Sequence, residues 1–165
     1  MNKNKYALDQ HIQNNSPIVF GCMGLGGAWD NSPIGADEIT QAHHVIDTAI
    51  DYGITLFDHA DIYTKGKAEQ VFGEILKQRP ELRTQIAIQS KCSIHFEDDC
   101  GPKRYDSSPA WIIESVENSL KRLNIEQLDI LMLHRPDPLM EPELIARTFD
   151  ALQSSGKVKH FGVSN

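Results

Sequence analysis

Short apolar runs alternate with helical patterns along this chain, and this alternation limits the possible folds more than any other feature. Five runs are typical of strands: 17–21 (PIVFG), 54–58 (ITLFD), 85–91 (QIAIQSK), 128–134 (LDILMLH) and 158–165 (VKHFGVSN). Helical patterns fill the intervals 35–53, 67–80, 108–123 and 141–156. Strands and helices that alternate in this way form right-handed βαβ units around a parallel sheet. The sequence therefore predicts an open doubly wound sheet or a (β/α)₈ barrel.

Local signals predict where the helices begin and end. Asp37 is the expected N-cap of the first helix, and Gly53 its stop. Ser108 and Pro109 supply a cap and a first-turn proline for the third helix. The stretch 92–107 has no clear period, and we expect a long irregular excursion over one face.

The glycine cluster after the first strand separates the two fold classes. An open sheet that binds a dinucleotide carries G-x-G-x-x-G between its first strand and the following helix. Residues 21–27 read GCMGLGG, which has a different register, and the helical pattern starts only near Asp37. The barrel is therefore the favoured fold.

Charge and composition exclude several functional classes. The net charge is −7 and no basic stripe is present, which argues against a nucleic-acid surface. No apolar run approaches the roughly 18 residues of a membrane span, and the first residues lack a signal-peptide pattern. Three cysteines (Cys22, Cys92 and Cys100) fit a reducing compartment better than a disulfide framework. These observations predict a cytoplasmic protein.

Chemically useful side chains recur where the predicted strands end. They are Gly21-Cys22-Met23, Asp58 with Tyr63 close behind, Lys91, His134, and Ser164-Asn165. Catalytic groups of barrels and α/β sheets lie at the carboxyl ends of parallel strands. A lysine at such a buried position is costly unless it is paired. We therefore expect these side chains to converge on an active site.

The residue types indicate proton transfer to an oxyanion. A carboxylate beside a lysine holds the ammonium in place, and an ammonium beside a phenol stabilises the phenolate. The tyrosine can then give or take a proton, while the histidine orients a carbonyl oxygen. No activated serine or cysteine accompanies the set, which disfavours acyl transfer. Since side chains do not deliver hydride, a nicotinamide cofactor is the expected source.

The motifs FDHADIY, QSKC, LMLHRPD and FGVSN together resemble the aldo-keto reductases, which are NADP-dependent (β/α)₈ barrels. The resemblance covers roughly 17–165 in the right order, and DHADIY with HRPDPL is most similar to a bacterial oxidoreductase branch. It implies reduction of an aldehyde or ketone to an alcohol with NADP(H). It also implies that 1–165 is the N-terminal part of one barrel domain, which takes a small carbonyl or alcohol substrate.

The resemblance implies a role for individual residues. The family's catalytic tetrad corresponds to Asp58, Tyr63, Lys91 and His134. The positions that contact or flank the cofactor correspond to Gly21, Cys22, Met23, Asp58, Ser164 and Asn165. Trp29 matches an aromatic wall of the substrate pocket, although a surface role fits it equally well. His59 and Asp61 are expected only to tie down their loop by hydrogen bonds.

The number of strands differs from that of a whole barrel. A (β/α)₈ domain needs about 250 residues and eight strands, whereas five strands are predicted here. We expect a truncated, cleaved or incompletely built chain, with the cofactor's phosphate loops lying beyond Asn165. The 165-residue chain alone is then expected to be inactive and to associate through the edge of its fifth strand.

Two other functions remain open. One is a catalytically silent binding or regulatory subunit with the aldo-keto reductase fold. The other is a metal-dependent barrel hydrolase that uses Asp58, His59, Asp61 and His134. Its first strand would be expected to carry His-x-His, but this strand reads IVFGCM, so we expect no metal site.

Overall fold

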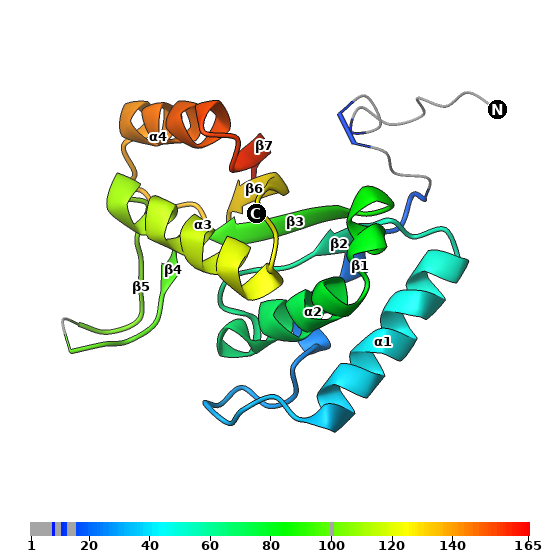
Figure 1. The fold of residues 1–165 in the computed structure, drawn as a ribbon. Coiled ribbons are helices and arrows are strands. Elements are labelled where there is room, and N and C mark those ends of the chain that lie inside the picture. The colour runs from blue at the N-terminus through cyan, green and yellow to red at the C-terminus, as the bar shows by residue number, and fades with distance from the viewer. Residues whose placement is uncertain (1–7, 9–10, 13–15, 100) are drawn as a thin grey trace.

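A five-stranded parallel sheet forms the centre of the protein in the computed structural model (Figure 1). The structure describes residues 8, 11–12, 16–99 and 101–165. The strand order is β1-β2-β3-β6-β7, and within the described residues it follows the sequence without reversing. A doubly wound sheet reverses its strand order at a switch point, whereas a (β/α)₈ barrel adds strands in sequence. The sheet therefore has the topology of part of a (β/α)₈ barrel.

The predicted alternation of strands and helices is confirmed. The sheet strands are β1 (Phe20–Gly21), β2 (Leu56–Asp58), β3 (Ala87–Cys92), β6 (Leu128–Leu133) and β7 (Val158–Val163). The α-helices are α1 (Ala36–Asp51), α2 (Lys67–Gln78), α3 (Pro109–Leu123) and α4 (Pro142–Ser154). Short 3₁₀ helices are η2 (Cys22–Gly24), η3 (Tyr63–Gly66) and η4 (Pro80–Thr84). None of the helices in the described part of the chain is long and apolar enough to cross a membrane.

The helix ends correct one prediction and confirm two. Asp37 is not the N-cap of α1, because the helix starts at Ala36 and Gly35 occupies the N-cap position, two residues earlier than predicted. The Glu38 carboxylate then accepts a hydrogen bond from the Gly35 N–H at 2.9 Å. Gly53 follows the helix with a φ of +77°, as a stop residue should. The Ser108 hydroxyl accepts from the Trp111 N–H at 3.3 Å, which caps α3 as predicted.

Two strand predictions need correction. The first strand is limited to Phe20–Gly21, because only these residues pair with β2. The excursion 92–107 is not wholly irregular, since β4 (Ile94–His95) and β5 (Arg104–Tyr105) form a small antiparallel sheet within it. This hairpin stands away from the main sheet beside α3 (Figure 1).

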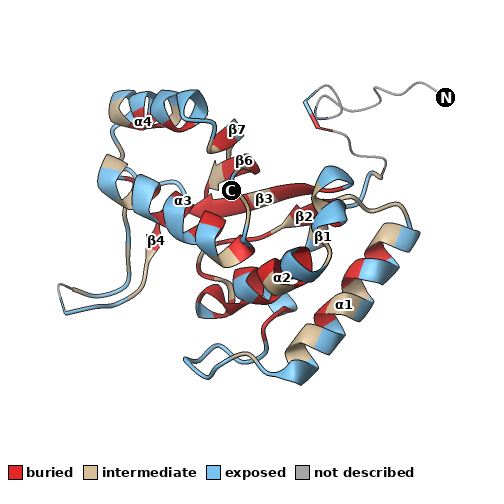
Figure 2. Ribbon diagram, in the orientation of Figure 1, coloured by how far each residue is buried: buried red, intermediate tan, exposed pale blue. Residues whose placement is uncertain are grey.

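The helices cover one face of the sheet. Successive helices contact one another, α1 with α2, α2 with α3 and α3 with α4, and their buried sides face the strands (Figure 2). The largest wholly buried side chains of this layer include Phe57, Phe72, Ile88 and Ile112. At Gly73 helix α2 meets the end of α3 so closely that an added Cβ would lie 2.0 Å from the Arg122 carbonyl oxygen.

The opposite face of the sheet changes character along the strands. Near the amino ends, Leu56, Ala87 and Ile130 form a small apolar cluster. Successive residues of a strand point to opposite faces, so Asp58 and Lys91 lie on this same face nearer the carboxyl ends. On this face the side chains are therefore apolar near the amino ends of the strands and polar near the carboxyl ends. The carboxyl end of this face is called the mouth of the sheet below.

Candidate active site

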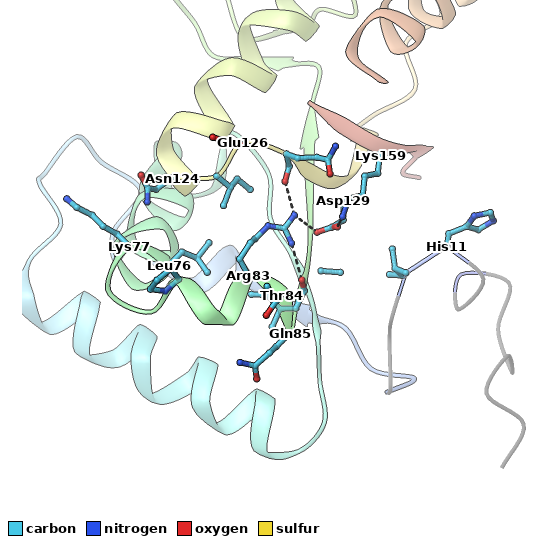
Figure 3. Close-up of a pocket in the computed structure, with 16 residues that line it drawn as sticks. His11, Leu76, Lys77, Arg83, Thr84, Gln85, Asn124, Glu126, Asp129 and Lys159 are labelled. Atoms are coloured by element: carbon cyan, nitrogen blue, oxygen red, sulfur yellow. Dashed lines mark hydrogen bonds and ion pairs between the residues drawn. The ribbon is translucent and has the colours of Figure 1, made fainter. Parts of the chain in front are cut away.

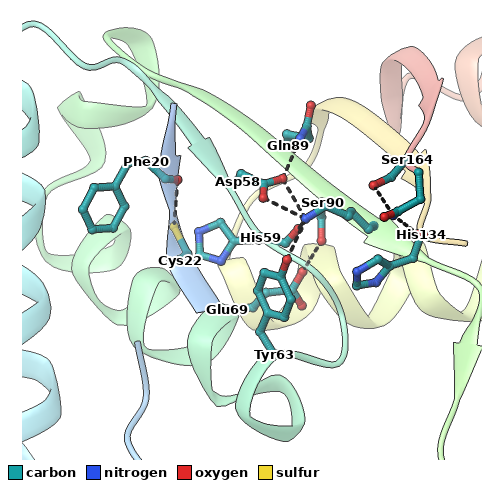
Figure 4. Close-up of polar contacts among 12 residues, drawn as sticks. Phe20, Cys22, Asp58, His59, Tyr63, Glu69, Gln89, Ser90, His134 and Ser164 are labelled. Carbon is teal, nitrogen blue, oxygen red and sulfur yellow. Dashed lines mark hydrogen bonds and ion pairs between the residues drawn. The ribbon is translucent and has the colours of Figure 1, made fainter. Parts of the chain in front are cut away.

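The ammonium group of Lys91 is the centre of the site. It donates to a carboxylate oxygen of Asp58 at 2.8 Å, to the His59 carbonyl oxygen at 2.9 Å and to the Tyr63 hydroxyl at 2.9 Å (Figure 4). Lys91 is 5% exposed. An ammonium has three N–H donors, and each has an acceptor here. The buried charge is therefore paired and fixed in one orientation.

Neighbouring strands place Asp58 and Lys91. Asp58 is the last residue of β2 and lies opposite Gln89 on β3, two residues before Lys91. The Gln89 amide donates to the second carboxylate oxygen of Asp58 at 2.5 Å. Gln89 was not predicted as a site residue, although its spacing from Lys91 puts it on the same face of the strand. The carboxylate of Asp58 is therefore held from two positions on β3.

The loop after β2 places Tyr63. Its backbone continues along β3, since the His59 N–H donates to the Gln89 carbonyl oxygen at 2.8 Å. Thr64 and Lys65 then adopt left-handed conformations with φ of +47° and +57°. Such a conformation is unusual for a β-branched residue and needs support. The Thr64 hydroxyl supplies it by donating to the Leu25 carbonyl oxygen at 2.9 Å.

His134 brings an imidazole to the same mouth from the end of β6. The backbone N–H of His134 donates to the Cys92 carbonyl oxygen at 2.8 Å, which extends the pairing of β6 with β3. The ring lies edge-on to the Tyr63 ring, with centroids 5.9 Å apart and an interplanar angle of 80°. Burial, followed by the nearby Lys91 charge, lowers the pKa of His134 to about 4. The imidazole is therefore neutral at physiological pH.

The side chain of His59 does not tie down the loop, and that prediction is wrong. His59 is wholly buried, and neither ring nitrogen has a hydrogen-bond partner. Its ring packs edge-on against Phe72, with centroids 4.7 Å apart. Burial and the Lys91 charge lower the pKa of His59 to about 3. The loop is held instead by its backbone. The His59 carbonyl oxygen accepts from the Lys91 ammonium, and the Asp61 N–H donates to the Lys91 carbonyl oxygen.

The geometry does not favour the metal-site alternative. Among the described residues, no group of three or more His, Cys, Asp or Glu side chains could hold a metal ion. Asp58 is engaged by Lys91 and Gln89. The His59 imidazole packs on Phe72.

Ser164 and Asn165 lie beside His134. The Ser164 N–H donates to the Leu133 carbonyl oxygen at 3.0 Å, so the chain stays paired with β6 past the end of β7. The Asn165 side-chain amide donates to the His134 carbonyl oxygen at 3.1 Å and to the Ser164 hydroxyl at 2.9 Å. A hydroxyl and an amide therefore lie next to His134, and Figure 4 shows the position of Ser164.

The remaining predicted site residues lie at the end of β1 and in the loop after it. Cys22 is buried, and burial, with the charge of nearby Asp58, raises the pKa of its thiol. Gly21 is exposed, and an added Cβ there would meet no atom within 4 Å. Met23 is 56% exposed and Trp29 is 49% exposed. The pocket-wall role of Trp29 stays a prediction.

A pocket of about 750 Å³ lies away from the tetrad (Figure 3). Its lining includes Arg83, Asp129 and Lys159, and no tetrad residue takes part. The buried Asp129 carboxylate pairs with Arg83 at 2.8 Å and with Lys159 at 2.7 Å. It also accepts from the Ile88 N–H at 2.9 Å. Because these charged groups are already paired with one another, we interpret them as a network that stabilises the fold.

Comparison with known proteins gives a consistent picture. The model of the aldo/keto reductase family matches residues 17–165. An uncharacterised oxidoreductase of Bacillus subtilis, YcsN, is 47% identical over 125 residues, which cover 73% of this chain and 42% of that protein. A 6-dehydroglucose reductase of Agrobacterium fabrum is 39% identical over 154 residues, covering 91% of this chain and 50% of that protein. The chain thus spans about half the length of these relatives.

Solved structures agree in fold. An aldo-keto reductase from Bacillus halodurans in its holo form superposes with a TM-score of 0.73 at 31% identity, covering 89% of this chain and 45% of that one. One from Klebsiella pneumoniae in complex with NADPH has a TM-score of 0.68 at 26% identity, covering 89% of this chain and 44% of that one.

Proposed function

This chain belongs to the aldo/keto reductase family, and we propose that it supplies the catalytic side chains of an NADP(H)-dependent oxidoreductase that reduces an aldehyde or ketone to an alcohol. One observation carries the proposal. The Lys91 ammonium holds Asp58 on one side and the Tyr63 hydroxyl on the other, at 2.8 and 2.9 Å. A structural lysine needs only a counter-ion, whereas this one also polarises a phenol at the mouth of the sheet.

In the proposed reaction Tyr63 is the general acid. Reduction of a carbonyl group leaves negative charge on its oxygen, which must receive a proton. The Lys91 ammonium stabilises the phenolate that forms when Tyr63 gives its proton to that oxygen. Asp58 keeps the ammonium charged and oriented. The three side chains thus act as one unit around the reacting oxygen.

His134 is the proposed positioning group for the substrate. Its imidazole is neutral at physiological pH because burial lowers its pKa to about 4. A neutral imidazole can donate one hydrogen bond without adding a second positive charge beside Lys91. The edge-on arrangement with Tyr63 places both rings around the same mouth. A carbonyl oxygen bound there would lie between a hydrogen-bond donor and a proton donor.

The residues at the end of β7 fit one end of a nicotinamide cofactor. The Ser164 hydroxyl and the Asn165 amide lie next to the tetrad and offer the donors and acceptor that a carboxamide needs. The structure of the Klebsiella relative contains NADPH. A bound nicotinamide cofactor would supply hydride to the carbonyl carbon. Ser164 and Asn165 would orient it, and the segment Gly21–Met23, in which Gly21 and Met23 are exposed, would flank it.

A cofactor-oxidation assay tests the proposed function. The full-length protein is mixed with NADPH and a panel of aldehydes and ketones, and absorbance of the reduced cofactor is followed. The panel includes sugar aldehydes because one relative is a 6-dehydroglucose reductase. We expect turnover with NADPH that exceeds turnover with NADH. Tight NADPH binding without turnover on any carbonyl would indicate a catalytically silent subunit instead.

A further inference from the structure

A second pocket lies beside the catalytic loop and outside the tetrad. It has a volume of about 710 Å³ and is lined by Asn31 of the loop after β1, the loop after β2, the β4–β5 excursion and one side of α3. Asp58, Tyr63, Lys91 and His134 do not line it. Nothing in the proposed reaction uses this cavity, which is hereafter called the α3 pocket.

Three residues that line the α3 pocket carry buried polar atoms without hydrogen-bond partners. They are one carboxylate oxygen of Asp61, the Ser115 hydroxyl and the Trp111 indole nitrogen. Ser115 is 5% exposed. Burial raises the pKa of Asp61 to about 7, and the nearby Ser115 hydroxyl offsets part of that rise. A buried polar group that lacks a partner costs about 1–3 kcal/mol, so three in one place call for a partner.

Helix geometry brings two of these groups to one place. Trp111 and Ser115 are four residues apart on α3 and therefore lie on the same side of the helix. Asn118 and Arg122 continue that side along the pocket. Asp61 comes from the loop after β2 and lies near Ser115. A ligand in the pocket would meet a carboxyl group, a hydroxyl and an indole N–H.

The chemistry of these groups limits the ligand. The indole N–H only donates, the carboxylate accepts, and the serine hydroxyl does both. A ligand hydroxyl can accept from Trp111 and donate to Asp61, and the apolar walls Ile62, Ile94 and Phe96 suit a carbon skeleton. The lining mixes acidic side chains (Asp61, Glu97, Asp98) with basic ones (Lys65, Lys103, Arg122), so its charge does not select an anion. Arg122 is already held by Glu69 at 2.8 Å. A metal ion would lack ligands among the described residues.

We propose that the α3 pocket binds a small uncharged polyhydroxylated molecule, a polyol or sugar, through Asp61, Ser115 and Trp111. Asp61 lies between Asp58 and Tyr63 in the chain, and its N–H donates to the Lys91 carbonyl oxygen at 3.0 Å. An occupied pocket would thus stabilise the loop that holds the proposed general acid. The binding itself does not depend on the proposed reaction.

The two tryptophans of the chain make a direct test possible. The full-length protein is titrated with glycerol, sorbitol and glucose while the indole N–H signals are followed by NMR. We expect the Trp111 signal to move in a saturable way with at least one of these probes. Trp111→Phe assigns the Trp111 signal, and the exposed Trp29, assigned with Trp29→Phe, reports binding elsewhere. Because polyols stabilise proteins without specific binding, thermal shifts alone would not suffice.

Matched serine variants locate the site. Ser115→Ala should weaken binding about 5- to 10-fold, the effect of losing one hydrogen bond. Ser119→Ala is the control, because Ser119 is also buried on α3 but accepts from Arg122 and does not line the pocket. If the Ser115→Ala variant does not fold, Asp61→Asn tests the same site, because it also removes a proposed contact with the ligand. The proposal is overturned if no probe moves Trp111 separately from Trp29, if both serine variants bind equally, or if inorganic phosphate alone saturates the signal.

Discussion

Lys91 shows how one residue can organise a site. Its three acceptors come from a carboxylate, a backbone carbonyl and a phenol. The sequence could indicate the carboxylate and the phenol, because both residue types follow strand ends. It could not indicate the His59 carbonyl, since any residue type carries one. Side-chain chemistry at strand ends was therefore predictable, and backbone participation was not.

Tyr63→Phe tests the general acid. Loss of a positioned acid should lower kcat for carbonyl reduction by roughly 10²–10⁴, with little change in the Kd of NADPH. Steady-state kinetics and fluorescence titration of the full-length protein measure the two quantities. Tyr52→Phe is the control, because Tyr52 is 81% exposed. Wild-type turnover by the Tyr63 variant would remove this residue from the mechanism.

Lys91→Met tests the role of the ammonium. The variant should lose activity, and its kcat should depend on pH differently from the wild type, because the phenolate loses its neighbouring cation. A pH–rate profile separates this effect from a general loss of folded enzyme. The exposed Lys121→Met is the matched control. A lower rate with an unchanged profile would mean that Lys91 only supports the fold.

His59 makes the fold sensitive to acid. Its pKa is about 3 in the folded protein and is ordinarily 6.5, so the unfolded chain binds the proton more readily. The contribution of neutral His59 to the free energy of unfolding is fully present above pH 6.5. It decreases as the pH falls toward 3, by up to about 1.4 kcal/mol per pH unit. The lowered pKa of His134 also makes the folded state less stable in acid, whereas the raised pKa of Asp61 has the opposite effect. Both residues remain in a His59 variant, so a comparison with the wild type isolates the effect of His59.

His59→Leu should therefore lose less stability than the wild type between pH 6.5 and 4. Urea unfolding at several pH values measures this difference. His44→Leu, at an exposed position of α1, should follow the wild type. The explanation fails if the wild type and both variants show the same dependence on pH.

At the scale of helices and strands, strong periodicity predicted most elements. The fourth predicted strand, 128–134, agrees with β6 to within one residue, because its apolar run is buried and continuous. The β4–β5 hairpin was missed because each of its strands has only two residues. So short a pair has no periodicity and depends on its surroundings. The Gly35 cap was missed because it works through Glu38, three residues away.

The contact between α2 and α3 predicts an unusual effect at Gly73. In an exposed helix interior, Gly→Ala stabilises by about 1 kcal/mol. Here the added Cβ would lie 2.0 Å from the Arg122 carbonyl oxygen, so Gly73→Ala should destabilise by about 1–3 kcal/mol. Thermal or urea unfolding measures the change. Gln70→Ala, at an exposed position of the same helix, is the control. A stabilised Gly73 variant would show that the helices can move apart.

At the scale of the whole molecule, the order of strands and helices predicted a parallel sheet, and the register of the glycines in 21–27 favoured the barrel over the doubly wound sheet. What the sequence could not give is how the β2 loop turns toward Lys91. That turn depends on left-handed Thr64 and Lys65, which no residue pattern indicated. The α3 pocket likewise arises from four separate segments, namely the loops after β1 and β2, the β4–β5 excursion and α3.

The sheet edges predict how a polypeptide limited to residues 1–165 behaves. Within the described structure, β1 and β7 each have one neighbouring strand, and Val163 on β7 is 74% exposed. Open edges invite pairing with another chain. We expect this polypeptide to self-associate and to bind NADPH weakly, since most binding free energy should come from the cofactor's phosphates. Sedimentation and fluorescence titration measure both properties. A monomer that binds NADPH tightly and turns over would contradict the expectation.

The strand order also bears on how the chain can acquire its structure during synthesis. Each sheet strand after β1 pairs with the sheet strand just before it in the sequence. As the ribosome releases the chain from its N-terminus, each new strand finds its partner already made. Asp58 and Tyr63 would emerge first, Lys91 next and His134 last. Tyr63, the proposed general acid, and its partner Lys91 would thus be assembled before His134, the proposed positioning group.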